Sequence, residues 1–329
     1  MRKYTILLAT YNGEKYIKEF LDSLKNQSYT NWDLVVFDDE STDETVNIIN
    51  EFKKNVSNEI TVKVNNPGTK SAKKNFIELL KYAAKEDSIE YVFTADQDDY
   101  WHEDKISEFD KFIDKLISKT SEEEVLSKPI LIHSDLRVVD EKLETIAESM
   151  FEYANLYKNI GLRKLIVQNN VTGCAMLVNK ALLKGIYEAL NKDSDKIIMH
   201  DYFLAIYAKV FGEMYFIDKA LVSYRQHSDN SVGAKGAHSV IRLLKRLKEG
   251  KSIYRAQMEE SYIQAEYFYN CFSYMVKGPT DEIVIRKLRF IRAYGELKDS
   301  SSFKRKNFFA SHKVYKKGFI RRIMQMMYS

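Results

Sequence analysis

Short apolar runs alternate with amphipathic stretches over the first hundred residues of the chain. The apolar runs, each of strand length, are residues 4–9, 34–37, 60–64 and 91–95. Apolar positions recur at helical spacing in residues 14–26, 46–52 and 71–84. Alternation of this kind predicts right-handed βαβ units and a parallel sheet, in an α/β fold with helices on both faces.

Beyond about residue 130 the pattern changes. Further strands are expected at residues 131–135, 171–178, 215–217 and 221–224. An apolar helix that opens with His200 and Asp201 continues to residue 211, and from about residue 237 the pattern is helical, basic and rich in tyrosine. We predict a catalytic α/β domain over residues 1–235 and a basic helical region over residues 236–329.

Composition supports a globular chain in a reducing compartment. Hydrophobic residues make up 45% of 329 residues, which is enough for a sizeable core. The two cysteines, Cys174 and Cys271, match no metal-binding or redox spacing. The apolar run after Met1 is too short for a signal peptide, and no apolar window reaches about 20 residues. These features predict a cytoplasmic protein.

The net charge of +4 conceals a strong asymmetry. Residues 236–329 carry 20 Lys and Arg against 8 Asp and Glu, whereas the preceding part is net acidic. Apolar residues lie among these cations in residues 241–248 and 316–324. Two interpretations stay open: peripheral contact with the inner face of an anionic cell membrane, or a helical cap on the catalytic domain. No recognised nucleic-acid module is present, so no nucleic-acid partner is expected.

Polar clusters follow three of the predicted strands: Thr10–Glu14, Asp38–Asp43 and Asp96–Asp99. In open α/β sheets, ligands bind beyond the carboxyl ends of the strands. We therefore expect the three clusters to face a common crevice.

The third cluster, Asp96-Gln97-Asp98-Asp99, has the chemistry of a metal site. Three neighbouring acids raise one another's pKa unless a cation neutralises them. Carboxylates suit Mg²⁺ or Mn²⁺, which commonly bind substrate phosphates as well. A solvated loop is the alternative, but the position directly after a buried strand favours the metal.

Other polar residues allow two interpretations each. Ser41 or Asp43 can cap the next helix, which would leave Asp39 free to bind a base or ribose, although Asp39 can itself be a cap. Lys73 and Lys74, at a helix N-terminus, fit either a nearby diphosphate or a solvated face.

Several motifs together resemble the family 2 inverting glycosyltransferases of the GT-A fold. They are Ala9–Gly13, Phe37–Asp43 and Thr94–Trp101. Similarity to the rhamnosyltransferase-like subgroup extends this over about residues 3–235, through His102–Lys105, Asn169–Leu177, His200–Ala205 and Tyr224–Asn230. One position departs from the family pattern, because His200 stands where an acid usually precedes Asp201.

The resemblance implies roles for individual residues. Asp201 would be the general base, and Asp98 the principal metal ligand, with Asp96 and His227 beside it. The donor would contact Thr10, Tyr11, Asn12, Glu14, Asp39, Lys74, Asp96 and Gln97. The loop and surface near the sugar and acceptor would include Gly173, Cys174, Asp99, Trp101 and His200.

The implied reaction moves a sugar from a nucleotide-diphosphate donor to an acceptor hydroxyl, with Mn²⁺ or Mg²⁺ as cofactor. dTDP-L-rhamnose is the first choice of donor and a UDP-sugar the second, with a cell-surface polysaccharide or lipid-linked glycan as acceptor. A non-catalytic nucleotide-sugar-binding or scaffold protein of the same fold is the alternative. A nicotinamide dehydrogenase is disfavoured, because no G-x-G-x-x-G follows the first strand.

Overall fold

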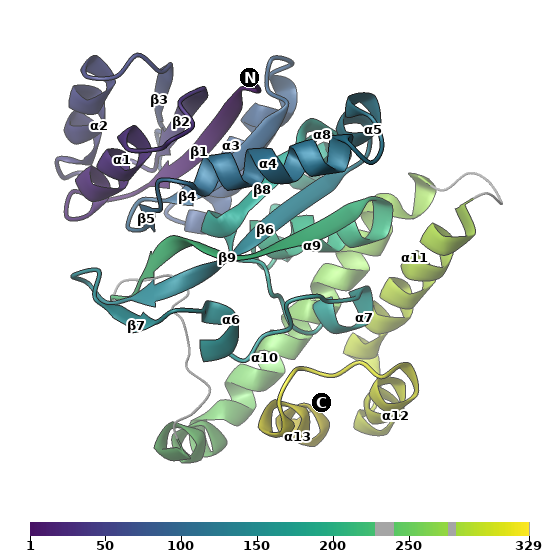
Figure 1. Cartoon of the computed structure of the whole chain (residues 1–329). Helices are drawn as coiled ribbons and strands as arrows, with labels where there is room; N and C mark the ends of the chain where they lie inside the picture. The colour runs from purple at the N-terminus through teal and green to yellow at the C-terminus, as the bar shows by residue number, and fades with distance from the viewer. Residues whose placement is uncertain (228–239, 276–280, 329) are drawn as a thin grey trace.

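The computed structural model describes residues 1–227, 240–275 and 281–328, with side chains in the long helix described from residue 252 onward (Figure 1). The strands are β1 (Tyr4–Thr10), β2 (Trp32–Asp38), β3 (Ile60–Val64), β4 (Tyr91–Asp96), β5 (Tyr100–Trp101), β6 (Ile130–Val139), β7 (Thr145–Ala147), β8 (Met176–Asn179) and β9 (Glu213–Arg225).

The helices follow in the same numbering. Those before residue 235 are α1 (Ile17–Lys25), α2 (Thr45–Lys54), α3 (Ala72–Lys85), α4 (Lys105–Ile117), α5 (Glu122–Ser127), α6 (Met150–Tyr153), α7 (Leu162–Leu165), α8 (Lys180–Lys192) and α9 (His200–Phe211). The later ones are α10 (Val240–Phe272), α11 (Glu282–Gly295), α12 (Ser302–His312) and α13 (Phe319–Tyr328). Short 3₁₀ turns are η1 (Gly173–Ala175), η2 (Ser194–Lys196), η3 (Ser273–Met275) and η5 (Glu296–Asp299).

The strands form one mixed sheet in the order β3-β2-β1-β4-β8-β6-β9-β5, with β7 paired to β6. The first four strands in sequence are parallel, as the alternating pattern predicts. β8 runs antiparallel to β4 and β6, and β9 returns parallel to β6. The predicted α/β class is confirmed, with helices on both faces of the sheet.

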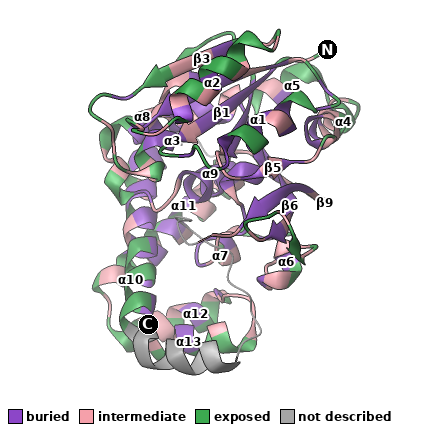
Figure 2. Ribbon diagram, turned by 90° about the vertical axis from the view of Figure 1, so that its left-hand side faces the viewer, coloured by how far each residue is buried: buried purple, intermediate pink, exposed green. Residues whose placement is uncertain are grey.

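Alternate residues of the central strands supply two separate cores. Ile6 and Leu8 of β1 face α1, α2 and α4, whereas Leu7 faces α3 and α8. This period of two is what a sheet covered on both faces requires. Figure 2 shows the buried residues concentrated along these strands and along the sides of the helices that face them.

The C-terminal helices are joined to the domain that precedes them. The buried Gln264 of α10 accepts a hydrogen bond from the Ile198 backbone N–H at 2.8 Å, directly ahead of α9. The Tyr267 hydroxyl donates to the Ala189 carbonyl at 2.5 Å and accepts from the Asp193 N–H at 3.0 Å. Buried backbone groups are thus satisfied by side chains of α10, which ties the helix to the segment that leads into α9.

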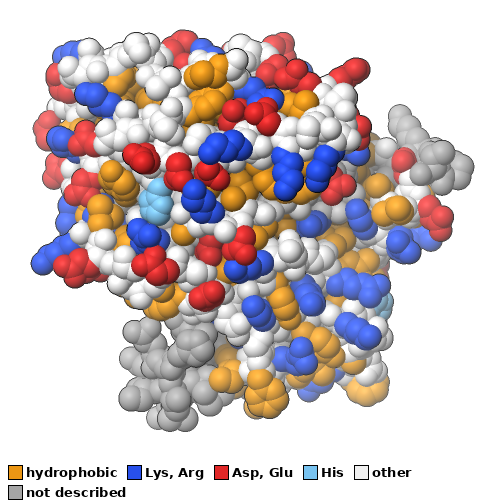
Figure 3. Space-filling view, in the orientation of Figure 1, with side chains coloured by type: hydrophobic (Ala, Val, Ile, Leu, Met, Phe, Trp, Pro, Cys, Tyr) orange, Lys and Arg blue, Asp and Glu red, His pale blue; other side chains and the backbone are white. Residues whose placement is uncertain are grey.

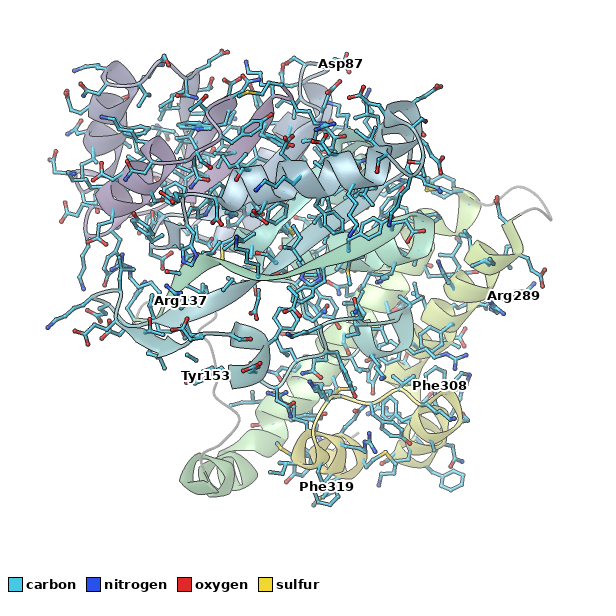
Figure 4. The ribbon with its side chains drawn as sticks, viewed as in Figure 1. Asp87, Arg137, Tyr153, Arg289, Phe308 and Phe319 are labelled. Carbon is cyan, nitrogen blue, oxygen red and sulfur yellow. The ribbon has the colours of Figure 1, made fainter. Side chains whose placement is uncertain are left out.

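The last helix and the turn before it are held to the same domain by basic residues. Lys317 Nζ donates to the Leu156 carbonyl at 2.7 Å, and Arg321 donates to the carbonyls of Asn155 and Ala154. The opposite side of α13 is exposed, with Phe319 at 78% (Figure 4). Across the described ranges, no helix has both the length and the apolar character needed to cross a bilayer.

Two predicted strands differ from the structure. Residues 171–178 are not one strand, because Gly173–Ala175 form a 3₁₀ turn and β8 begins only at Met176. Residues 215–217 and 221–224 belong to one strand, β9. The polar residues between the two apolar runs do not end the strand, because the pairing of β9 with β6 shifts register near Asp135 and continues beyond them. The predicted boundary near residue 235 and the side chains of residues 241–248 lie outside the described residues.

Candidate functional site

Three strand ends meet at one edge of the sheet. In the β1–β2 pair Thr10 lies opposite Asp38, and in the β1–β4 pair Ala9 lies opposite Asp96. The polar residues that follow these strands therefore leave the sheet at the same level. The predicted convergence of the polar clusters is confirmed.

Asp98 lies in the turn after β4 and is held from two directions. Its Oδ2 is 2.6 Å from His227 Nε2, and its backbone carbonyl accepts a hydrogen bond from Arg225 Nε at 2.7 Å. Arg225 also bonds Glu19 of α1 and the Glu141 carbonyl, and its guanidinium lies 4.5 Å from the centre of the Tyr16 ring. A carboxylate oxygen and an imidazole nitrogen thus adjoin at the end of β9, 129 residues apart in the sequence.

The other two acids of the cluster adjoin a thiol. Ligand atoms of Asp96, Asp99 and Cys174 lie within 4.8 Å of one another. Burial raises the pKa of Asp99 and, with the nearby Asp98 and Asp201 carboxylates, raises that of Asp96 to about 7. Burial beside these acids also raises the pKa of Cys174 well above its usual range, so the thiol stays protonated. The three groups form a compact, largely buried cluster, and a protonated thiol is a poor ligand for Mg²⁺ or Mn²⁺.

Lys105, the first residue of α4, is fully buried beneath the same acids. Its Nζ donates to the Cys174 carbonyl at 2.6 Å and lies 3.2 Å from the centre of the Trp101 ring. Burial lowers the pKa of the ammonium, while the adjacent thiol, Asp99 and Asp96 oppose that shift. The lysine is therefore both a counter-charge for Asp96 and Asp99 and an anchor for the Gly173–Cys174 turn.

The same turn lies against the start of α9. Asp201 is 9% exposed, and its Oδ1 accepts the Tyr202 N–H at 2.6 Å. Gly173 and Asn169 also donate to this carboxylate, but burial outweighs these bonds and raises its pKa to about 7. Chemically, a half-protonated carboxyl near neutral pH is suited to accept a proton.

His200 occupies the space behind the turn. Its ring stacks on Phe76 with centroids 4.2 Å apart, and burial lowers its pKa to about 3, so it is neutral. A Cβ on Gly173 would lie 2.7 Å from His200 Nε2, which explains the glycine at this position. The ring packs against the turn rather than presenting a polar group to the site surface.

On the other side of the cluster, Gln97 bridges β4 and the loop after β1. It accepts from the Tyr11 N–H at 3.0 Å and donates to the Tyr11 carbonyl at 2.9 Å. A Cβ on Gly13 would lie 2.3 Å from Gln97 Oε1, so a larger residue there would displace the Gln97 amide from this bridge. The Tyr11 ring itself is 52% exposed and is available to a flat ligand.

Asn12 and Glu14 continue this loop toward α2. Asn12 takes a left-handed conformation with φ of 44°, and its Oδ1 accepts the Thr42 N–H at 2.9 Å. Glu14 Oε2 accepts the Glu44 N–H at 3.0 Å. Both side chains thus fix the loop after β1 to the start of α2.

The expectation that Asp39 is free to bind a ligand is wrong. Its Oδ1 accepts the Thr69 N–H at 2.5 Å, and its Oδ2 accepts the Thr69 hydroxyl and the Ser71 N–H. Thr10 is buried as well, and its hydroxyl donates to Asp38 Oδ2 at 2.7 Å. The polar atoms of both residues are therefore used within the protein, where they hold neighbouring strands and loops together. The N-cap position of α2 is Glu44, which makes no side-chain cap bond, and the preceding Asp43 accepts the Thr45 N–H through Oδ1 at 3.1 Å.

Two further candidates lie away from the cluster. Trp101 is completely buried between Phe20 and Phe93, so the expected contact with the acceptor is wrong. Lys74 Nζ is 3.2 Å from Asp195 Oδ1, and both side chains are largely exposed. A pairing of this kind is weak in water, so the lysine is not committed to it.

Sequence reasoning assigned no role to Lys105 or Arg225. A signal for Lys105 is its spacing, because it stands four and eight residues before the buried Phe109 and Ile113 on α4. Arg225 ends an apolar strand, and only the fold shows that Glu19 and Glu141 lie around it.

Comparison with known proteins agrees with this geometry. The model of the family described as Glycosyl transferase family 2 matches residues 5–117. The dTDP-rhamnosyl transferase RfbG of Shigella flexneri is 32% identical over 237 residues, which cover 69% of this chain and 74% of that protein. The chain belongs to glycosyl transferase family 2.

Other relatives share shorter segments or the fold. The poly(ribitol-phosphate) beta-N-acetylglucosaminyltransferase TarS of Staphylococcus aureus is 32% identical over 117 residues, 35% of this chain and 19% of that protein. The crystal structure of S. aureus TarS 1–349 in complex with UDP-GlcNAc aligns with a TM-score of 0.54 at 20% identity, covering 99% of this chain and 91% of that one. The fold of this family member is therefore GT-A, as the sequence motifs imply.

Replacement of Lys105 by Met tests whether the lysine is a required counter-charge. Removing one partner of a buried charge cluster costs about 3 kcal/mol in the free energy of unfolding. Urea denaturation of Lys105→Met should show this loss, whereas Lys111→Met, an exposed lysine of the same helix, should change little. Adding Asp99→Asn to Lys105→Met should restore part of the stability. If Lys105→Met were as stable as Lys111→Met, Lys105 would not be a required counter-charge.

Proposed function

We propose that this protein is an inverting, metal-dependent glycosyltransferase that moves a sugar from a nucleotide-diphosphate donor to a hydroxyl group. The observation that carries the proposal is that one short turn, Gly173–Ala175, joins the acids after β4 to the start of α9. Cys174 lies with Asp96 and Asp99 in a cluster whose ligand atoms are within 4.8 Å, and Gly173 packs against His200, the residue before Asp201. A single displacement at the anomeric carbon needs a base beside the attacking hydroxyl and a binding site for the leaving diphosphate on the opposite side of the sugar.

The residues around Asp98 fit a divalent cation. Carboxylate oxygen and neutral imidazole nitrogen are both ligands of Mn²⁺, and Mg²⁺ favours the carboxylates. Asp98, His227 and Asp96 would hold the ion, and Asp99 would support them through its bond to the Arg225 N–H at 3.0 Å. The cation would supply positive charge to offset that of the leaving diphosphate.

The chain's own residues would orient the donor and accept the proton. The Tyr11 ring offers a face to the base, with Asn12, Glu14 and Gln97 setting its loop and Thr10 and Asp39 behind it. Lys74 would turn from Asp195 toward the diphosphate. Asp201 would take the proton from the acceptor hydroxyl as that oxygen attacks the anomeric carbon, while the Gly173–Cys174 turn covers the sugar.

The relatives guide the choice of substrates. Because RfbG is described as a dTDP-rhamnosyl transferase, dTDP-L-rhamnose is our first donor and a UDP-sugar the second. The acceptor would be a cell-surface polysaccharide or a lipid-linked glycan, reached in the cytoplasm at the inner face of the membrane. The alternative is a scaffold that binds a nucleotide-sugar without turnover.

Replacement of Asp201 by Asn tests the proposed base. Transfer from dTDP-L-rhamnose or a UDP-sugar in Mn²⁺ should fall at least about 100-fold, because the amide cannot take the proton, whereas donor binding should persist. Asp193→Asn, which alters a surface ion pair just before the helix, should retain the wild-type rate. Transfer by Asp201→Asn at the wild-type rate would show that Asp201 is not the base.

The pH dependence of the wild type follows from the same carboxyl. Its pKa is raised to about 7, so the proton-accepting form predominates above that pH and is lost below it. The transfer rate should therefore fall as the pH is lowered from 8 toward 5. No transfer or donor hydrolysis at any pH, with donor binding intact, would favour the scaffold.

Metal removal and a variant of His227 test the cation. Mn²⁺ with dTDP or UDP should raise the melting temperature of the wild type, and a chelator should abolish that shift. Loss of a ligand should raise the Mn²⁺ concentration needed by at least about tenfold in His227→Gln. His312→Gln, a change on α12, serves as the control. A nucleotide-induced shift that survives chelation would count against the metal.

We further propose that the exposed side of α13 rests on an anionic membrane. Phe319, Ile320, Ile323 and Met327 are exposed there, and Arg322 lies among them. An apolar strip flanked by cations is suited to the headgroup region of a bilayer. Lys317 and Arg321 are already bonded to the domain, so the strip would be presented by a helix that is fixed in place.

Liposome co-sedimentation tests this contact. The double variant Phe319→Ser with Met327→Ser should bind phosphatidylglycerol vesicles with an affinity at least about tenfold lower than that of the wild type, because two large apolar side chains are removed from the bilayer contact. Ile146→Ser with Ile253→Ser removes two exposed apolar side chains elsewhere and is the matched control. Equal binding by the two double variants would rule out α13 as the contact.

A further inference from the structure

A concave surface lies where the helical C-terminal region meets the catalytic domain. Its volume is about 590 Å³, within the range of ligand sites. Five of its lining residues are cations, here called the basic pocket: Arg163, Lys164, Arg286, Lys287 and Lys313. They come from α7, from α11 and from the end of α12, and none of the other lining residues is acidic.

The cations of the basic pocket are not neutralised by the chain as described. None of the five forms an ion pair in the described residues, although Glu213 attracts Lys287 from outside the pocket. Elsewhere on the surface, exposed lysines commonly pair with neighbouring acids, as Lys54 does with Glu51 and Lys128 with Glu124. In Figure 3 the basic side chains gather over the region of α7, α11 and α12, with hydrophobic side chains between them. Like charges brought together without a partner are an electrostatic cost that a multivalent anion would remove.

The remaining contacts of the pocket indicate the kind of anion. Leu162 and Phe290 form an apolar part of the lining, and the Phe290 ring stacks on Phe308 at 5.8 Å. Lys164 Nζ lies 4.2 Å from the centre of the Tyr157 ring, which keeps that cation beside the same surface. Several phosphates carried on an organic chain match this mixture better than a bare inorganic ion.

The basic pocket is connected to Asp201 through α9, because elements that line the pocket pack against that helix. Both α7 and α11 pack against α9, and Lys287 Nζ donates to the Val210 carbonyl near the end of that helix at 3.3 Å. Asp201 is near the other end, about 14 Å from Val210 along a helix of 12 residues. The basic pocket and the proposed base therefore lie toward opposite ends of one helix.

We propose that the basic pocket binds phosphate groups of a phosphate-bearing acceptor, and so selects the acceptor at a distance from the transferred sugar. This inference rests on the proposed function, because it assumes that Asp201 receives the acceptor hydroxyl. The shared chemistry is a phosphate ester or diphosphate, whose source is either the acceptor itself or a lipid headgroup.

Titration with inorganic tripolyphosphate in excess chelator tests the pocket apart from any metal-bridged diphosphate site. The wild type should bind, and Arg163→Glu with Arg286→Glu should bind at least about tenfold more weakly. Arg289→Glu with Lys304→Glu makes the same change of charge on exposed residues of α11 and α12 outside the pocket lining, and should bind like the wild type (Figure 4). The milder Arg163→Gln with Arg286→Gln should show a smaller loss and guards against misfolding. Equal binding by the pocket and control variants would overturn the proposal.

Two further arms separate the source of the phosphate and the proposed function. If the pocket variant still binds phosphatidylglycerol vesicles like the wild type, the result supports an acceptor as the source of the phosphate. If vesicle binding is lost as well, the pocket binds a lipid headgroup, and the assignment to the acceptor is overturned. Donor hydrolysis in Mn²⁺ should be unchanged in the pocket variant. A wild type that binds tripolyphosphate but neither hydrolyses nor transfers any donor would instead overturn the proposed function and leave the pocket standing.

Discussion

The structure depends on placing three buried or half-buried carboxylates at the end of a central strand. Charged oxygens there cost several kcal/mol each unless counter-charges or hydrogen bonds compensate for lost water. Different groups of the chain stabilise the three carboxylates. Lys105 lies under Asp96 and Asp99, His227 bonds Asp98, and the Arg225 backbone N–H bonds Asp99. The elements that supply them, α4 and the end of β9, are therefore fixed relative to β4 by electrostatics as well as by packing.

The same constraint couples the carboxylates to the proposed base. Lys105 Nζ holds the Cys174 carbonyl, and the preceding residue, Gly173, donates to Asp201. A movement of the 3₁₀ turn would thus alter both the counter-charge of the acids and the hydrogen bonding of the base. The buried, neutral His200 behind Gly173 limits such movement, since its ring leaves no space for even a Cβ. One short turn therefore sets the geometry on both sides of the site.

Much of this arrangement could be read from the sequence, and the exceptions have physical causes. A buried parallel strand such as β4, Tyr91–Asp96, carries a clear apolar run, so its end, and the acids that follow, could be located. The turn Gly173–Ala175 is as apolar as a strand, and hydropathy alone does not reveal its hydrogen bonding. Likewise, Asp39 and Trp101 have residue types typical of ligand sites, but their partners Thr69 and Phe20 are far away in sequence. The local sequence pattern therefore predicts the secondary-structure elements and the kind of chemistry, whereas the contacts of each side chain can be known only from the fold.

The C-terminal region has a physical role that its charge alone did not reveal. Among its described cations, some satisfy backbone carbonyls of the preceding domain, as Arg321 does, and others, such as Arg286, line the basic pocket. The first group fixes the helices in place, and the second can then be held close together despite mutual repulsion. Because Gln264 of α10 also binds the segment that leads into α9, the region supports the helix that carries Asp201 at one end and contacts Lys287 at the other. Acceptor recognition and proton transfer would therefore share a single rigid helix, which keeps their separation constant during the reaction.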